Sequence, residues 1–79
     1  MLLKPDTPYR VTKGNTDGCV IVGDILYIDG KTGKLVVNHG GGWLEPDELT
    51  PEVMDFEAEI AEDYEIARLG RMTALRKKG

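Results

Sequence analysis

Residue types that could support catalysis are few in this chain of 79 residues. His39 is the only histidine and Cys19 the only cysteine, and the chain contains no serine. Nucleophilic catalysis needs a hydroxyl or thiol that is held beside a general base. Cys19 begins an apolar run that is typical of a buried structural thiol, and a lone loop histidine is usually solvated. We therefore predict that the chain is not an enzyme and that it binds no cofactor and no metal.

Three consecutive glycines, residues 40–42, precede the only tryptophan, Trp43. A phosphate-binding loop would lead into a helix N-terminus and carry a Lys-Ser/Thr pair, and the sequence has neither feature here. The glycines would let the backbone bend sharply or pass close beneath the Trp43 ring. Tryptophan is also common at interface hot spots. Trp43 is thus either a core residue or the centre of a binding surface.

Two tyrosines and three acidic residues complete the candidate binding surface. In small β-barrels, ligands commonly dock on aromatic side chains between the hairpin loops. Tyr9 and Tyr27 are the candidates beside Trp43, and both are alternatively core residues. The acidic residues that would edge this patch are Glu45, Asp47 and Glu48. The predicted ligand is a protein partner, and a homodimer is an alternative because a thin core and exposed barrel edges favour burial in a dimer.

Charge is distributed unevenly along the chain, whose formal net charge is −4. Residues 45–65 contain ten acidic and no basic residues, whereas residues 66–79 contain five basic and no acidic residues. The acidic segment could be a solvated face, supply paired carboxylates or mimic nucleic acid. The basic residues could bind nucleic acid or fold back on the acidic segment: Arg68, Arg71, Arg76, Lys77 and Lys78. Because no aromatic residue lies among them, a nucleic-acid-binding regulator ranks below a protein-binding module.

Short strands and tight turns account for the first 61 residues. Residues 25–29 and 34–38 are rich in β-branched and aromatic side chains and flank a glycine-containing turn, which predicts a hairpin. Residues 9–12 and 19–22 form further short runs. Over residues 53–61, apolar and acidic side chains alternate, which favours a strand. A helix that begins after Thr50 stays open as the alternative.

The apolar spacing changes from Glu62 onward. Acidic residues then precede basic ones, an order that suits a helix dipole, and the apolar residues fit one helical face: Tyr64, Ala67, Met72 and Leu75. We therefore predict a C-terminal helix with a basic tail at about residues 62–79. The remainder, at about residues 7–61, predicts a mainly all-β, SH3-like antiparallel barrel of about five strands in a single domain.

Residues 22–29, 40–49 and 55–59 resemble a family of short uncharacterised proteins of Gram-positive bacteria and their phages and prophages. The stretch Gly-Gly-Trp-Leu-Glu around Trp43 is its most specific part. The resemblance implies an SH3-like barrel and a phage or prophage accessory protein, and it assigns no activity and no functional residues.

A cytoplasmic location fits the sequence best. Its apolar stretches are far shorter than the roughly 20 residues that span a bilayer, so no membrane partner is expected. The first residues carry no apolar segment typical of a secretory signal, and a lone cysteine forms no intrachain disulfide.

Overall fold

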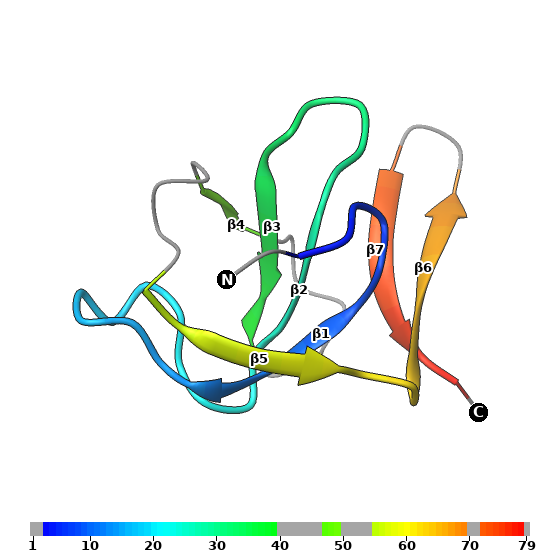
Figure 1. Cartoon of the computed structure of the whole chain (residues 1–79). Coiled ribbons are helices and arrows are strands. Elements are labelled where there is room, and N and C mark those ends of the chain that lie inside the picture. Colours follow the sequence, from blue (N-terminus) through cyan, green and yellow to red (C-terminus); the bar gives the residue numbers. More distant parts are fainter. Residues whose placement is uncertain (1–2, 40–46, 50–54, 70–71, 79) are drawn as a thin grey trace.

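The computed structural model describes residues 3–39, 47–49, 55–69 and 72–78, of which residues 47–49, 68–69 and 72–74 are described by their backbone alone. Within this part, seven strands form two antiparallel sheets (Figure 1). The prediction of a mainly antiparallel β protein is confirmed, but the sheets are not closed into a barrel. No helix among the described residues is long and apolar enough to cross a membrane.

The predicted hairpin lies at the centre of the larger sheet. Strand β2 (Ile25–Ile28) pairs with β3 (Leu35–Asn38) over all four positions. The Gly33 N–H donates to the Asp29 carbonyl at 2.8 Å, which closes the turn between them. Gly33 has a φ of +72°, a left-handed conformation that glycine adopts at no steric cost. The hairpin prediction is therefore confirmed.

The remaining strands of this sheet extend the hairpin on both sides. Strand β4 (Asp47–Leu49) pairs with β3, and β1 (Tyr9–Lys13) pairs with β2 on one side and β5 (Glu57–Ile60) on the other. The order is β4-β3-β2-β1-β5, so β4 and β5 are the edge strands. Strand β5 lies inside the predicted strand at residues 53–61, and residues 50–54 lie outside the described part of the chain.

Apolar side chains cover both faces of the larger sheet, because alternate residues of a strand point to opposite faces. One face contributes to a core cluster of Tyr9, Val11, Val20, Leu26, Leu35, Val37 and Phe56. The opposite face, which we call the outer face, contributes to a cluster of Ile25, Tyr27, Val36, Ala61 and Leu75. The nearly continuous apolar runs of β2 and β3 therefore reflect burial on two sides.

The prediction of a C-terminal helix is wrong. This segment forms a second antiparallel hairpin of β6 (Tyr64–Leu69) and β7 (Met72–Lys77). The apolar spacing fits a helical face, but it also places Tyr64 and Ile66 on one face of a strand, where Ile66 lies opposite Leu75. Leu75 is buried against the outer face of the larger sheet. Burial of that face decides the conformation, because tertiary packing overrides local propensity.

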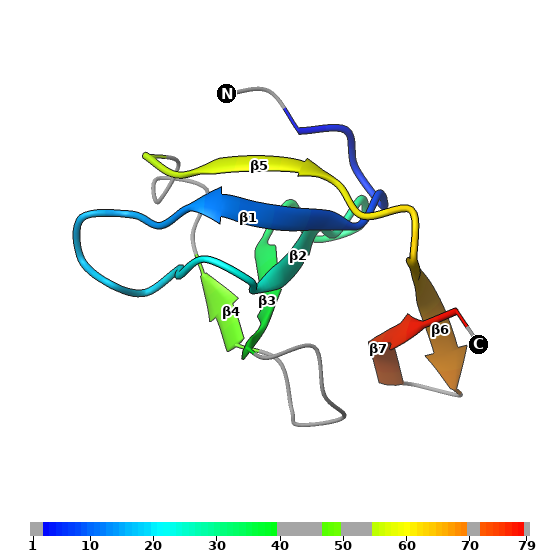
Figure 2. The same cartoon turned by 90° about the horizontal axis from the view of Figure 1, so that it is seen from below.

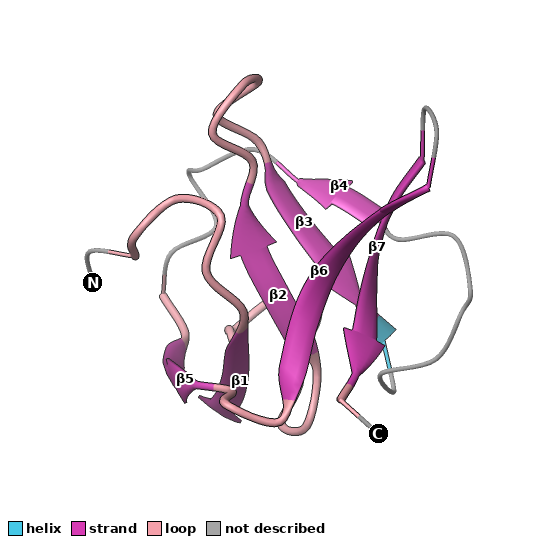
Figure 3. Ribbon diagram, turned by 90° about the vertical axis from the view of Figure 1, so that its right-hand side faces the viewer, coloured by secondary structure: helices cyan, strands magenta, loops and turns pink. Residues whose placement is uncertain are grey.

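Side-chain contacts hold the hairpin of β6 and β7 beside the larger sheet, together with contacts made by residues 61–63, which connect β5 to β6. Figure 2 shows it beside the sheet, and in Figure 3 it crosses over β2 and β3. No ladder joins the two sheets within the described ranges. Instead, the Ala61 N–H donates to the Pro8 carbonyl at 3.0 Å. Arg10 donates to the Asp63 carboxylate at 2.6 Å and lies over the Tyr64 ring, 5.8 Å from its centroid.

Candidate functional site

The predicted surface around Trp43 falls largely outside the described residues. Trp43 and Glu45 lie there entirely, together with Arg71 of the alternative nucleic-acid surface. Asp47 and Glu48 belong to the edge strand β4, where only the backbone is described, and they lie opposite residues of β3. The Trp43-centred surface therefore stays a prediction.

The two tyrosines of the predicted platform are buried and lie on opposite faces of the larger sheet. Tyr9 is 7% exposed and Tyr27 is 2% exposed, and each belongs to a different core cluster. The Tyr9 hydroxyl accepts the Lys4 N–H at 2.9 Å, which satisfies this buried polar group. The structure does not bring the two rings together, and both are core side chains, as the alternative interpretation had them.

One residue of the basic C-terminal set is bound within the chain. Arg76 donates from Nε to a Glu65 carboxylate oxygen at 2.8 Å, and its Nη2 also donates to that oxygen. The two residues are directly opposite in the ladder of β6 and β7. Of the two alternatives for the basic tail, this pair shows the one in which it contacts the acidic segment. The others are exposed or lack a described side chain: Lys77, Lys78, Arg68 and Arg71.

Carboxylates of the acidic segment are also engaged by neighbours. Asp55 accepts the Thr16 N–H at 3.1 Å, and Asp63 and Glu65 each accept hydrogen bonds from an arginine. The two arginines offset the charge of Asp63 and Glu65, whereas the hydrogen bond from Thr16 leaves the charge of Asp55 in place. These contacts give no support to nucleic-acid mimicry.

These carboxylates predict a fall in stability at acid pH. The hydrogen bond from Arg10 lowers the pKa of Asp63 below its ordinary value of 3.8, and the backbone hydrogen bond from Thr16 lowers the pKa of Asp55. A lowered folded-state pKa gives stability that is fully present above the ordinary pKa and is lost as the pH falls through the folded-state pKa. We therefore expect the free energy of unfolding to fall as the pH drops below about 4, the ordinary pKa of these carboxylates.

Urea denaturation followed by circular dichroism checks this dependence. Asp63→Asn removes one of the two carboxylates and should make the fall with pH shallower than in the wild type. Asp17→Asn is the matched control, because Asp17 is exposed in a turn. An Asp63→Asn slope equal to that of the wild type would contradict the prediction.

The loop between β1 and β2 ends in a tight turn that exposes two apolar side chains. Ile21 is 53% exposed and Val22 is 67% exposed. The Asp24 N–H donates to the Ile21 carbonyl at 3.1 Å, and Gly23 has a φ of +95°, as a type II turn requires at its third position. Val11 of β1 accepts from the Gly23 N–H at 3.0 Å and donates to the Asp24 carbonyl at 2.9 Å. The backbone of the turn is therefore fixed to the sheet.

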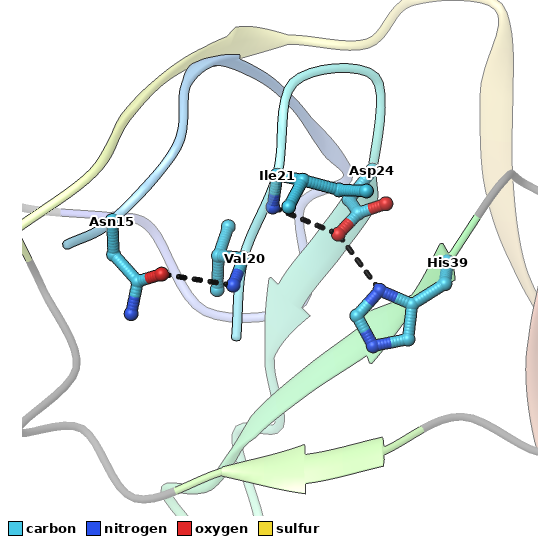
Figure 4. Close-up of polar contacts among 5 residues, drawn as sticks. All are labelled: Asn15, Val20, Ile21, Asp24 and His39. Carbon is cyan, nitrogen blue, oxygen red and sulfur yellow. Dashed lines mark hydrogen bonds and ion pairs between the residues drawn. The ribbon is translucent and has the colours of Figure 1, made fainter. Parts of the chain in front are cut away.

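The Asp24 carboxylate fixes the same turn a second time (Figure 4). This carboxylate is 2% exposed, and its Oδ2 accepts the Ile21 N–H at 3.1 Å and lies 2.8 Å from His39 Nδ1. A buried carboxylate is costly unless it has polar partners, and the Ile21 N–H and the His39 ring supply them. Because His39 directly follows β3, the contact joins the loop to the end of that strand.

The earlier part of the loop is equally constrained. The Asn15 amide oxygen accepts the Val20 N–H at 3.0 Å (Figure 4). The Asn15 N–H also donates to the Val20 carbonyl at 2.9 Å. A Cβ at Gly14 would lie 2.7 Å from that carbonyl oxygen, so only glycine fits. These contacts fix the backbone of the loop, so the turn that carries Ile21 and Val22 is held in one conformation.

The residue types that could support chemistry are placed as follows among the described residues. No group of three His, Cys, Asp or Glu residues within the described ranges could hold a metal ion. Cys19, which the sequence predicts to be buried, is exposed, because residues 19–22 lie in the loop and its turn and form no strand. His39 contacts the Asp24 carboxylate through Nδ1.

Comparisons with protein family models, with curated proteins and with solved structures found no match to this chain. The candidate site is therefore defined by its geometry: the exposed turn of Ile21 and Val22, with Asp24 and His39 behind it. Sequence reasoning assigned Ile21 and Val22 to a short strand-like run. The Gly-Asp pair that follows Val22 is the local signal of a turn.

Proposed function

We propose that this chain is a non-enzymatic binding module with an SH3-like core that contacts a protein partner. Its contact surface is the turn of Ile21 and Val22 together with the predicted patch around Trp43. The observation that carries the proposal is the exposure of two adjacent β-branched side chains on a turn fixed by hydrogen bonds and a buried carboxylate. A cytoplasmic location and a phage or prophage origin belong to the same proposal.

The fixed backbone supports binding because it lowers the entropic cost of association. A flexible loop loses conformational freedom when a partner orders it, whereas a turn already held in place loses little. Ile21 and Val22 are also stiff at χ1, since both are β-branched. Burying the exposed parts of these side chains would contribute about 1–2 kcal/mol each.

The position of His39 supports a surface shared with Trp43. His39 contacts Asp24 behind the turn, and Trp43 follows His39 by four positions in the sequence. Four residues of extended chain span at most about 14 Å, which is the largest distance that the chain allows between His39 and Trp43.

The strand order supports the SH3-like part of the proposal. Strands β1 to β4 follow one another as an antiparallel meander, and β5 returns to the free side of β1. A twisted five-stranded antiparallel sheet with this connection is suited to curling towards a small barrel.

A tagged capture from bacterial lysate, made with and without nuclease, tests the function. The wild-type chain should retain a protein that resists nuclease. Replacement of both Ile21 and Val22 with serine should lower the affinity for that protein by about a hundredfold, because two apolar contacts are lost. Trp43→Ala should also weaken it.

The matched control is Lys31→Ser, which shortens an exposed side chain in the turn between β2 and β3 and leaves the turn of Ile21 and Val22 intact. It should leave the capture unchanged. Equal capture by the double serine variant and the wild type would contradict the proposal, provided that both show the same circular dichroism spectrum. Capture that disappears with nuclease would favour the nucleic-acid alternative.

A further inference from the structure

The outer edge of β5 is a second candidate surface, separate from the turn. Strand β5 is the last strand of the larger sheet, and β1 is its only partner among the described strands (Figure 1). An edge strand presents backbone N–H and C=O groups that another strand can pair with. Glu57 and Glu59 are exposed on β5 and alternate with Ala58 and Ile60.

Strand β1 shows which kind of strand pairs with β5. Its basic residues lie opposite the two glutamates: Arg10 with Glu59 and Lys13 with Glu57. Its apolar residues lie opposite the apolar ones: Val11 with Ala58 and Tyr9 with Ile60. Opposite charges and apolar pairs at directly opposed positions stabilise a ladder, and like charges destabilise it.

An irregularity in β1 reinforces this complementarity. The register shifts between Val11 and Lys13, so that Thr12 is an extra residue in the ladder. Without the shift, Thr12 would lie opposite Glu57, and Lys13 would share the face of Val11. The bulge therefore places a cation opposite the second glutamate.

We propose that the free edge of β5 binds an extended protein segment in which basic and apolar residues alternate. A strand added to this edge meets the same two faces of β5 that β1 meets on the other side. Its cations would lie beside Glu57 and Glu59, and its apolar residues beside Ala58 and Ile60. Ile60 lies opposite the buried Tyr9 but is itself 54% exposed. An added strand would therefore bury apolar surface of Ile60 that β1 leaves exposed.

A second copy of the chain does not fit this edge. If β5 pairs with itself about a twofold axis, every register places a glutamate opposite either another glutamate or an apolar residue of β5. The first arrangement is repulsive, and the second pairs a charge with an apolar side chain. Nucleic acid is disfavoured by the same two carboxylates.

The probe is a peptide of alternating lysine and valine, about ten residues long, added to the ¹⁵N-labelled full chain. The amide signals of Glu57–Ile60 should shift and their exchange with solvent should slow. A peptide of the same composition with its lysines and valines in separate blocks should bind at least about tenfold more weakly, because it matches one face only. Equal binding of the two peptides would reduce the interaction to charge attraction and overturn the proposal.

Backbone pairing is tested with two N-methylated forms of the alternating peptide, one methylated at the lysines and one at the valines. A strand turns alternate N–H groups towards opposite edges. One form should therefore lose binding while the other keeps it. Retention by both forms, or signal shifts at residues 21–24 instead of β5, would overturn strand addition at this edge.

The protein side is tested with a Glu57→Gln and Glu59→Gln double variant, which keeps side-chain shape and removes both charges. It should bind the alternating peptide about fivefold more weakly and with a flatter salt dependence. Glu62→Gln is the matched control, because Glu62 is exposed just beyond β5. Since the turn of Ile21 and Val22 is a different surface, failure here leaves the capture experiment unaffected, and failure there leaves this one standing.

Discussion

Leu75→Ala is expected to lower the free energy of unfolding by about 3 kcal/mol, as large-to-small core substitutions do. Leu75 is 2% exposed and packs with Ile25, Tyr27 and Val36 on the outer face of the larger sheet. No ladder joins the hairpin of β6 and β7 to that sheet in the described chain, so its docking depends on such side chains. Chemical denaturation measures the loss.

Ile60→Ala is the control for this substitution, because it shortens an exposed side chain of the same size class. It should cost less than about 1 kcal/mol. If both variants lose the same small amount, the hairpin is not docked on the sheet. The far-ultraviolet circular dichroism of the wild type should lack a helical signal, since residues that were predicted to be helical form β6 and β7.

Asp24→Ala is expected to cost about 2–3 kcal/mol, because it leaves a backbone donor without its partner. The substitution removes the acceptor of the Ile21 N–H and the partner of His39 Nδ1 together. The turn that presents Ile21 and Val22 should then lose its fixed position. Amide exchange at Ile21 should accelerate by more than the global loss of stability explains.

Asp29→Ala provides the matched comparison. Asp29 also lies in a turn and accepts a backbone hydrogen bond, from Lys31 at 2.8 Å, but this bond is exposed to solvent. Its loss should cost less than about 1 kcal/mol. Equal costs for the two substitutions would mean that the buried position of Asp24 adds nothing, and the turn would then be held by its backbone contacts alone.

Local patterns predicted the elements whose contacts are close in sequence. The hairpin of β2 and β3 was identifiable because two β-rich runs flank a turn with glycine at a position of positive φ. The alternation of residues 53–61 predicted β5 correctly for the same kind of reason. The C-terminal hairpin was not identified, because Ala, Leu, Arg and Glu favour helix, and the competing signal is the apolar outer face of β2 and β3.

The candidate site was less accessible to sequence reasoning. Tyr27 lies within an unbroken apolar run, which indicates burial on both faces and could have excluded it from an exposed platform. The contact of Asp24 with His39 joins two residues that lie in different elements, and no local pattern marks it. The exposure of Ile21 and Val22 follows from that contact and from the turn, so it became visible only in three dimensions.

The pairing of β1 with β5 has a consequence for how the chain folds during synthesis. Strand β1 leaves the ribosome first, but its outer neighbour β5 follows only after β2, β3 and β4, so closing this contact carries the largest loop-closure cost in the sheet. The apolar outer face of β2 and β3 is covered later still, when Leu75 of β7 packs on it. Until β7 docks, Ile25, Tyr27 and Val36 stay exposed on that face, and this is the stage at which the folding chain most needs protection from aggregation.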